Sequence, residues 1–404
     1  MRVAYFVPYV PNLIRVRSYN LLLQLAKQGI DVTLFTIAAN DQDLADAAAL
    51  KSQLADVVVW TQPLWRSMIN CAIALPTKTP LQSVFSWNPN LQADFALRQN
   101  GFDIVHVEHL RGSKYGRLIK SRFPDLPVVW DSVDCISHLF AQTAARSRSL
   151  TGKLMSMLEL KRTRRAEGEL VDLFDHTLIT SQVDKAEIVR LASSKTNPIS
   201  ILPNGADLDF FRRNTDSPRD AETIVFTGKM SYHANVSMVD YLVREIMPKV
   251  WAKRPTAKLI VVGKDPPRKV REFAQNPRIE VTGTVADIRP YLWRATVAVV
   301  PLVYGAGIQN KILEAMASET PVITTSAAFL GLQANPGADA LIGDNADDFS
   351  EAILRLIEDQ SLQRQIRRAG LLYVNERHDW SAIASQLISI YRDTILRGKN
   401  SVSK

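Results

Sequence analysis

Short apolar runs and amphipathic stretches alternate along nearly the whole chain. The pattern begins with "RVAYFVPYV" at 2–10, which predicts a strand, and "SYNLLLQLAKQG" at 18–29, which predicts a helix. Further strands are predicted at 31–37, 103–109, 127–133, 176–182, 223–229, 257–263, 279–285, 295–302 and 320–326. Helical stretches such as 236–254 and 347–370 separate them. This alternation favours open parallel sheets covered by helices, so we expect an α/β fold.

The length of the chain indicates two domains. A chain of 404 residues is too long for one hydrophobic core, because single cores stop growing well below this size. The strongest turn signal near the middle of the chain is Pro203 to Gly205, where we place the boundary. We expect doubly wound, Rossmann-like domains at 1–202 and 203–376, then a closing helix at 377–396. Two such domains that face one another form a cleft at the carboxyl ends of their strands, where ligands bind.

The positive charge of the chain is concentrated in one window. Lys and Arg exceed Asp and Glu by 49 to 41 in the whole chain and by 15 to 7 within residues 66–165, so this window carries the entire excess of +8. Its densest part, 145–170, predicts a basic amphipathic helix, typical of a membrane-surface or anionic-ligand element. The alternative is a core-facing helix with a solvated basic face. The preceding segment 67–87 is apolar but broken by Pro76 and Pro80, which suits a surface loop or short helices near an apolar partner.

Composition also suggests partners and a compartment. Few aromatic residues interleave with the basic ones, so we expect an anionic membrane surface as a partner of residues 66–165, and no nucleic acid. The two cysteines, Cys71 and Cys135, are too few for a disulfide framework and fit a reducing compartment. The sequence shows no signal peptide and no apolar stretch of roughly 20 residues. We therefore expect a complete cytoplasmic chain, peripheral at the inner face of the membrane.

The stretch "YGAGIQNKILEAMASETPVI" joins glycines, a cation and a carboxylate at the end of a predicted strand. Gly305 and Gly307 let backbone approach a ligand, and the free amides of a helix that begins at Ile308 suit a diphosphate. Lys311 and Glu314 are three residues apart and share a helix face. A cation near a helix start opposes the helix dipole, so Lys311 suggests an anionic partner. The alternative is a glycine-flanked loop with a solvated lysine and glutamate.

This stretch does not stand alone. Together with "ILPNGADLDFF", "FTGKMSY", "VVGKDP", "VTGTVADIRPYL" and "HDWSAIASQLISIYRDTI", it resembles the retaining GT-B glycosyltransferases of the sucrose-synthase and mannosyltransferase type, family 4. The likeness runs over essentially the whole chain and extends to bacterial exopolysaccharide-associated sugar transferases, with "MxYxxN" after Gly228 and "GIxNKxLEAMA" in the donor helix. It implies two Rossmann-like domains facing a central cleft, with the closing helix crossing back to the N-terminal domain. The buried stripe of that helix is predicted from Trp380, Ile383, Leu387 and Tyr391, which recur at helical spacing.

The resemblance implies a nucleotide-diphosphate sugar bound by the C-terminal domain and a glycan or lipid-linked acceptor bound by the N-terminal one. Glu314 would hold the ribose hydroxyls, and Lys229 would neutralise the leaving phosphate. The predicted donor-binding residues are Gly228, Lys229, Gly263, Thr284, Val285, Gly305, Gly307, Ile308, Gln309, Asn310, Lys311 and Glu314. Fixed amides and cations aimed at the departing diphosphate supply the main catalytic stabilisation, so no cofactor and no metal ion are expected. The acidic pairs in "DQD" at 41–43 and "DLD" at 207–209 are interpreted as solvated turn residues.

The chain departs from the family pattern at three places. Family members usually carry a glutamate that contacts the donor sugar eight residues before the position of Glu314, where this chain has Ala306. A second family lysine is missing from "GKMSYHANVS", which has His233 and Asn235 in that neighbourhood. The family histidine after the strand "PVVW" is replaced by Val133. These departures indicate either a divergent donor pocket or a transferase without activity.

Charged residues follow two predicted strands of the first half. Arg15 and Arg17 in "PNLIRVRSYN" replace the family's glycine-rich loop and would complete a diphosphate or acceptor-phosphate site, unless they are surface arginines. His106, Glu108 and His109 in "VHVEHLRGS" end another strand. Strand alternation puts His106 and Glu108 on one face, where they either bind the acceptor or satisfy core backbone groups. We predict Arg15, Arg17, His106, Glu108 and Asp134 as acceptor-binding residues, and Lys229, Glu314, Arg17 and His109 as catalytic residues.

The predicted function is therefore transfer of a hexose from a nucleotide-diphosphate sugar to a glycan or lipid-linked acceptor. The resemblance implies retention of the anomeric configuration and a role in cell-surface or exopolysaccharide biosynthesis. Two alternatives remain open: a nucleotide-sugar epimerase of the same architecture, and a sugar-nucleotide-binding protein without catalytic activity.

Overall fold

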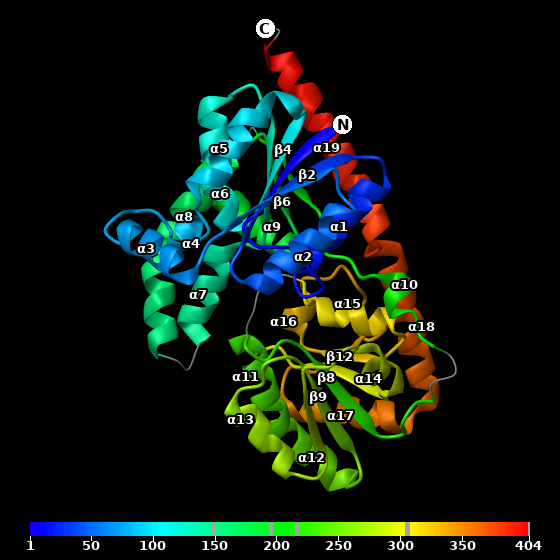
Figure 1. Cartoon of the computed structure of the whole chain (residues 1–404). Coiled ribbons are helices and arrows are strands. Elements are labelled where there is room, and N and C mark those ends of the chain that lie inside the picture. Colours follow the sequence, from blue (N-terminus) through cyan, green and yellow to red (C-terminus); the bar gives the residue numbers. More distant parts are fainter. Residues whose placement is uncertain (147–149, 194–196, 215–217, 304–307, 403–404) are drawn as a thin grey trace. The chain divides into compact units, whose positions relative to one another are not determined.

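The structure, a computed structural model, describes residues 1–146, 150–193, 197–214, 218–303 and 308–402. It divides the chain into two compact units (Figure 1). The first unit is Met1–Asn204 together with Trp380–Lys404, and the second is Gly205–Asp379. The divisions therefore fall after Asn204 and Asp379, whereas the sequence predicted them after residues 202 and 376.

The first unit contains a seven-stranded sheet in which every neighbouring pair is parallel. Its strands are β1 (Arg2–Val7), β2 (Asp31–Ala38), β3 (Asp56–Thr61), β4 (Ile104–Glu108), β5 (Val128–Val133), β6 (His176–Ile179) and β7 (Ile199–Ile201). They lie in the order β3-β2-β1-β4-β5-β6-β7. The order reverses between β1 and β4, and open parallel sheets bind their ligands at the carboxyl ends of the strands beside such a reversal.

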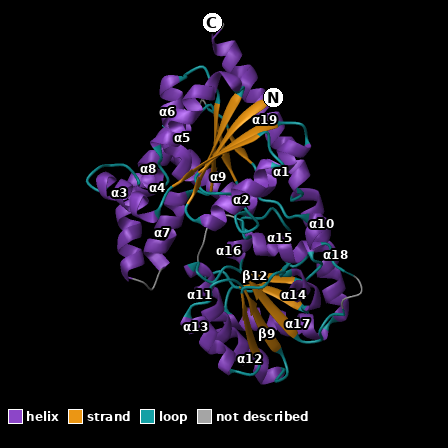
Figure 2. Cartoon of the chain, viewed as in Figure 1, coloured by secondary structure: helices purple, strands orange, loops and turns teal. Residues whose placement is uncertain are grey.

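Helices cover both faces of this sheet (Figure 2). Because side chains alternate along a strand, Val3 and Tyr5 of β1 join one core and Ala4 and Phe6 join the other. The first core also contains residues of α1 (Val16–Lys27), α2 (Asp41–Lys51) and α19 (Trp380–Val402). The second contains residues of α5 (Pro89–Arg98), α6 (His109–Arg122), α7 (Ile136–Arg146), α8 (Leu150–Leu173) and α9 (Gln182–Leu191).

The closing helix α19 belongs to the first unit although it follows the second unit in the chain. Its predicted stripe is confirmed, since Trp380, Ile383, Leu387 and Tyr391 are all buried in the same core as α1. The helix begins at Trp380, three residues after the predicted start at 377. This helix therefore ties the end of the chain to the first sheet.

The second unit contains a six-stranded parallel sheet around a single core. Its strands are β8 (Thr223–Thr227), β9 (Lys258–Val262), β10 (Ile279–Gly283), β11 (Val297–Val300), β12 (Val322–Thr324) and β13 (Leu341–Ile342), in the order β10-β9-β8-β11-β12-β13. The helices are α10 (Leu208–Phe211), α11 (His233–Tyr241), α12 (Met247–Lys253), α13 (Arg268–Arg271), α14 (Arg289–Arg294), α15 (Asn310–Ala317), α16 (Ser326–Phe329), α17 (Ala346–Glu358) and α18 (Gln360–Arg377). Two parallel, helix-covered sheets are the predicted Rossmann-like pair.

Several predicted boundaries in the second unit differ from the structure by a few residues, and two of them lie near the predicted donor site. Strand β11 ends at Val300 and not at Leu302, because Pro301 has no N–H to donate to the sheet. Helix α15 begins at Asn310, after its N-cap Gln309, and not at Ile308.

The stretch 145–170, predicted as one basic helix, is covered by α8 from Leu150 on, while residues 145 and 146 end α7. The short helices α3 (Leu64–Ala74) and α4 (Leu81–Phe85) precede them in the basic window. Met155 and Leu158 of α8 are exposed, whereas Ser156 and Glu159 are buried. The alternative of a core-facing apolar stripe is therefore wrong for this part of α8. Among the described residues, none of the helices combines the length and the apolarity that crossing a membrane requires.

Candidate active site

A small polar cluster follows the carboxyl end of β8 in the second unit. The Asn235 side chain of α11 donates from Nδ2 to the backbone carbonyl of Lys229 at 2.8 Å and accepts on Oδ1 from Lys311 Nζ at 2.6 Å. The same Nζ lies 4.6 Å from the centre of the Phe226 ring. One amide side chain thus connects the loop after β8 to the predicted donor helix α15.

Two glycines let these elements approach so closely. A Cβ atom on Gly228 would lie 2.8 Å from Asn235 Nδ2 and 3.1 Å from Lys311 Nζ. A Cβ atom on Gly263, after β9, would lie 1.8 Å from the carbonyl oxygen of Gly228, far inside any permitted contact. Both predicted glycines therefore shape the site through the side chains that they lack.

The charges of Lys311 and Glu314 are largely withdrawn from water. Burial lowers the pKa of Lys311 to about 7, although the neighbouring Glu314 carboxylate opposes this shift. Burial likewise raises the pKa of Glu314 to about 7, and Lys311 opposes that shift. Among the described residues Lys311 forms no ion pair, and the Glu314 carboxylate neither accepts a hydrogen bond nor forms an ion pair. Both groups consequently retain the capacity to bind a ligand of opposite or complementary character.

The other predicted donor residues occupy different environments. The side chains of Lys229 and Thr284 are exposed, and Val285 packs in part against the core. Ile308 is buried, Gln309 caps the start of α15 without a side-chain hydrogen bond, and Asn310 is its first residue. Gly305 and Gly307, with Ala306 between them, lie outside the described residues.

A second polar cluster lies at the carboxyl ends of the strands in the first unit. Arg17 of α1 is only 6% exposed, so the alternative of a surface arginine is wrong. Its Nε and Nη2 atoms donate to Asp131 Oδ2 at 2.9 and 2.8 Å, and Nη2 also donates to the carbonyl of Leu202 at 3.1 Å. Its Nη1 atom donates to the carbonyl of Pro203 at 3.1 Å and to Asn204 Oδ1 at 2.8 Å. These five bonds use all five donors of the guanidinium.

His106 of β4 belongs to the same buried cluster. Its ring stacks on Tyr5 of β1 with centroids 3.9 Å apart, and its Nδ1 is 2.8 Å from the hydroxyl of Tyr391 in α19. Its Nε2 lies 3.8 Å from Asp131 Oδ2, beyond hydrogen-bonding distance. Burial lowers the pKa of His106 to about 4, so the ring is neutral near pH 7.

Glu108 follows His106 on the same face of β4, as strand alternation predicted. Its carboxyl group accepts from the hydroxyls of Tyr9 at 2.5 Å and Tyr5 at 3.4 Å. Burial and the nearby charge of Asp131 raise the pKa of Glu108 to about 7. Tyrosine side chains of the interior therefore supply the contacts of both residues, whereas the predicted alternative named core backbone groups.

The remaining predicted residues of the first unit line the ends of the same strands. Arg15 precedes α1, donates to the carbonyl of Val10 at 2.8 Å, and lies 3.5 Å from Asp43. His109 begins α6 with a φ of 63°, and burial lowers its pKa to about 4. Asp134 is half-buried after β5, where burial raises its pKa to about 7. None of the three is fully enclosed, so they are the more accessible members of the predicted acceptor set.

Val133, which replaces the family histidine, has a φ of 66°. A branched residue rarely adopts this conformation, because its Cβ crowds the following backbone. The turn after β5 is thus held in an unusual geometry beside Asp134 and Asp131. Such strain is more common at functional sites than elsewhere.

Three contributors were missing from the predicted site list: Asp131, Tyr391 and Asn235. Asp131 is three residues before Asp134, which was on the list. Asn235 lies in the stretch where the family has its second lysine. Tyr391 was interpreted as a packing residue only, and its bond to His106 joins residues 285 positions apart. The partial signal for Asn235 was its place in the "MxYxxN" motif after Gly228.

Known proteins resemble the chain in sequence and in fold. The profile described as "Glycosyltransferase Family 4" matches residues 14–210, and "Glycosyl transferases group 1" matches residues 221–359. A phosphatidyl-myo-inositol mannosyltransferase of Mycolicibacterium smegmatis is 26% identical over 202 residues, which cover 47% of this chain and about half, 50%, of that protein. Sucrose-phosphate synthase from Thermosynechococcus elongatus superposes with a TM-score of 0.73 at 19% identity, covering 98% of this chain and 99% of that one. HepE of Anabaena, solved in complex with UDP, gives a TM-score of 0.68 at 14% identity, covering 97% and 100%.

Proposed function

The chain belongs to the family-4 type glycosyltransferases of GT-B fold, and from that premise we propose that it transfers a hexose from a nucleotide-diphosphate sugar to a glycan or lipid-linked acceptor. The transfer retains the anomeric configuration and contributes to a cell-surface or exopolysaccharide glycan. The family resemblance supports retention and this biosynthetic role, and the UDP bound to the structurally similar HepE supports a nucleotide donor.

One observation carries the donor site: the half-buried Lys311 ammonium is fixed by Asn235 at 2.6 Å and forms no ion pair with a described carboxylate. Removing a charge from water is costly unless a partner compensates for it. The ammonium is held by Asn235 and lies near the start of α15, where the backbone amides have no side-chain cap. Uncapped amides and a fixed cation together suit a diphosphate.

The proposed roles follow from this geometry. Lys311, the exposed Lys229 and the amides at the start of α15 neutralise the departing diphosphate, so the transfer needs no metal ion. Glu314 accepts hydrogen bonds from the ribose hydroxyls. Gly228 and Gly263 keep the backbone after β8 and β9 free of side chains that would block the ligand.

Acceptor contacts are proposed for Arg15, His109 and Asp134, which lie at strand ends without being fully enclosed. Arg17 is a positioning residue rather than a contact residue, because its five donors are used within the protein. It fixes α1, the end of β5 and the chain after β7 relative to one another.

Thermal shift measurements test the donor site. UDP-, GDP- and ADP-sugars are added in turn to the purified chain, to Glu314→Ala and to the control Glu351→Ala, which removes an exposed carboxylate of α17. We expect one nucleotide class to raise the Tm of the natural chain and of Glu351→Ala but not of Glu314→Ala. A response to no nucleotide would contradict the donor site and favour a protein that has lost transferase activity.

A further inference from the structure

Helix α3 of the first unit presents its apolar side to solvent. Leu64, Trp65, Met68, Ile69 and Ile73 are exposed by 65%, 64%, 59%, 48% and 70%, and Leu75, just beyond the helix, by 49%. Residues 64, 65, 68, 69 and 73 recur at helical spacing, so they form one continuous face. Globular proteins rarely leave so many large apolar side chains together in water, and such a face indicates an interaction surface.

The polar side of α3 is turned inward, which is the reverse of an ordinary amphipathic helix. Buried Ser67 accepts a hydrogen bond from Gln62 Nε2 at 3.0 Å. Asn70 Nδ2 donates to the backbone carbonyls of Val84 at 3.1 Å and Trp87 at 3.0 Å. These bonds fix the rotation of the helix, so the apolar face cannot turn inward without breaking them.

Helix α8 extends the exposed surface. Leu81 donates its backbone N–H to Glu159 at 2.7 Å, and Arg162 Nη2 donates to the carbonyl of Leu75 at 2.5 Å. These bonds place α8 beside the segment that follows α3. On the same side of α8 as Glu159 and Arg162, Met155 and Leu158 are exposed by 52% and 45%. We call the exposed apolar residues of α3, Leu75 and these two residues the apolar ridge.

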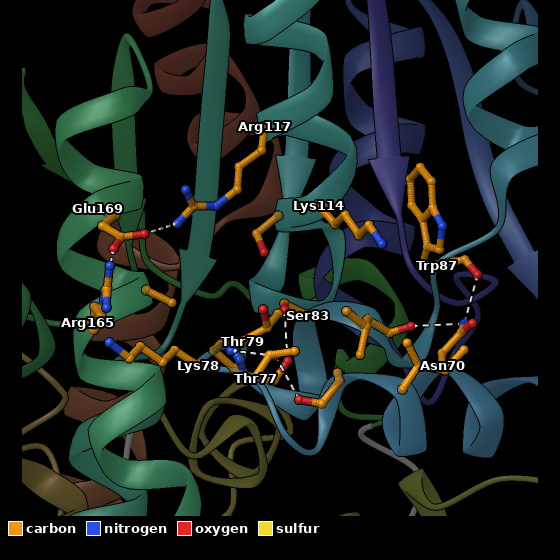
Figure 3. A pocket seen from close by; sticks show the side chains of 16 residues that line it. Asn70, Thr77, Lys78, Thr79, Ser83, Trp87, Lys114, Arg117, Arg165 and Glu169 are labelled. Atoms are coloured by element: carbon orange, nitrogen blue, oxygen red, sulfur yellow. Dashed lines mark hydrogen bonds and ion pairs between the residues drawn. The ribbon is translucent and has the colours of Figure 1, made fainter.

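A basic pocket of about 630 Å³ adjoins the ridge (Figure 3). Ile73 belongs to both, and the pocket walls come from the segment 70–87, from α6 and from α8. Four cationic side chains and one carboxylate line it: Lys78, Lys114, Arg117, Arg165 and Glu169. Glu169 accepts from Arg117 at 2.9 Å and from Arg165 at 2.7 Å. The pocket therefore keeps an excess of positive charge beside an apolar surface.

We propose that the apolar ridge enters the interfacial layer of an anionic lipid bilayer, and that the basic pocket binds the phosphate of one lipid headgroup. Charge complementarity selects this occupant: residues 66–165 hold the whole positive excess of the chain, so anionic lipid attracts this region, while the ridge supplies apolar area. Trp65 and the cations suit the boundary between headgroups and hydrocarbon. The inference deepens the proposed function, on which it rests for the acceptor, because a lipid-linked acceptor is reached at a membrane surface.

Vesicle sedimentation tests the ridge. The full chain is mixed at low salt with vesicles of phosphatidylcholine alone or of phosphatidylcholine and phosphatidylglycerol. We expect binding to the anionic vesicles, and Trp65→Ser with Ile69→Ser should weaken it about tenfold or more, because both side chains lose apolar burial. Leu97→Ser is the matched control, since Leu97 is 86% exposed in α5 and lies outside the ridge. Equal binding by the ridge variant and the natural chain would overturn the proposal.

A second pair of variants tests the pocket. Lys78→Glu should reduce the preference for anionic vesicles, whereas Lys253→Glu, at an exposed lysine of α12, should reduce it less. Equal effects of the two variants would mean that Lys78 acts only through the overall charge of the protein, and would overturn the role of the pocket. A chain that binds no vesicle but forms a ridge-dependent dimer in sedimentation velocity would assign the ridge to a second copy and also overturn the proposal. The nucleotide-induced Tm shift should be the same in all these variants. This measurement therefore distinguishes an error in the proposed donor site from an error in the proposed membrane surface.

Discussion

The two polar clusters of this protein use their charges in opposite ways. In the first unit, Arg17 is buried and its five donors are matched by acceptors of the protein itself. In the second unit, Lys311 is desolvated and forms no ion pair with a described residue. Both are basic residues that follow the carboxyl end of a strand, and sequence reasoning assigned both to ligand binding. The difference teaches that a charge whose donors are all matched within the fold supports structure, whereas a charge without an ion-pair partner is available for a ligand.

The largest effect should come from breaking the satisfied cluster. Arg17→Ala leaves the Asp131 carboxylate buried without its ion-pair partner, so we expect a loss of about 3–5 kcal/mol in unfolding free energy. Urea unfolding followed by circular dichroism measures it. The control is Arg98→Ala, because the Arg98–Asp56 pair is 49% and 37% exposed. An exposed pair contributes about 1 kcal/mol or less. Similar losses in both variants would show that Arg17 contributes little to stability, and Arg17 would again be a candidate ligand-binding residue.

The second prediction concerns the backbone that shapes the unsatisfied cluster. Gly263→Ala places a Cβ atom 1.8 Å from the carbonyl oxygen of Gly228, and backbone cannot move aside as a flexible side chain would. We expect a loss of about 3 kcal/mol in unfolding free energy from this overpacking. The matched control is Gly101→Ala, whose Cβ atom would meet nothing within 4 Å. A stable Gly263→Ala protein would mean that β8 and β9 tolerate a wider separation than the structure shows.

The third prediction tests how α19 supports the first cluster. Tyr391→Phe removes the hydroxyl that lies 2.8 Å from His106 Nδ1. It leaves a buried imidazole nitrogen without a partner, which should cost about 1–3 kcal/mol of unfolding free energy. Tyr241→Phe serves as the control, since the half-buried Tyr241 makes no hydrogen bond through its hydroxyl among the described residues. If both variants unfold at the same urea concentration, the contact between Tyr391 and His106 adds nothing measurable to the attachment of the closing helix.

The same contrast explains what the sequence could predict. Alternating apolar and amphipathic segments predicted the parallel sheets, because strand and helix periodicity are local properties. Gly228, Gly263, Lys311 and Glu314 follow strand ends within short motifs, so they too were accessible from local sequence. The bond from Arg17 to Asp131 joins residues 114 positions apart, and no local pattern records such a pairing. Chemistry-bearing residues could be found from the sequence, but whether their charges are already matched could not.

Helix α3 shows a second limit of sequence reasoning. Segment 67–87 is predicted to be a loop or short helices near an apolar partner, and the structure has short helices there, since α3 covers its start and α4 lies within it. Periodicity identifies an apolar face but does not say whether that face meets the core or the solvent. Here the inward side is decided by Ser67 and Asn70, through bonds to residues elsewhere in the chain.

The smallest expected signal is a fractional proton exchange on donor binding, and it reports directly on the unsatisfied cluster. Without ligand, Lys311 and Glu314 both have a pKa of about 7. A bound diphosphate favours the ammonium form and raises the Lys311 pKa, so binding at about pH 8 should take up protons. Ribose hydroxyls that donate to the carboxylate lower the Glu314 pKa, so binding at about pH 6 should release protons.

Calorimetric titration with a nucleotide-diphosphate sugar, repeated in buffers of different ionisation enthalpy, measures this exchange. Lys311→Met should abolish the uptake at about pH 8 and leave the release, whereas Glu314→Gln should do the reverse. Lys253→Met, an exposed lysine of α12, should change neither. Proton uptake that persists in Lys311→Met would place the diphosphate elsewhere, and the second cluster would then need another explanation for its unpaired charge.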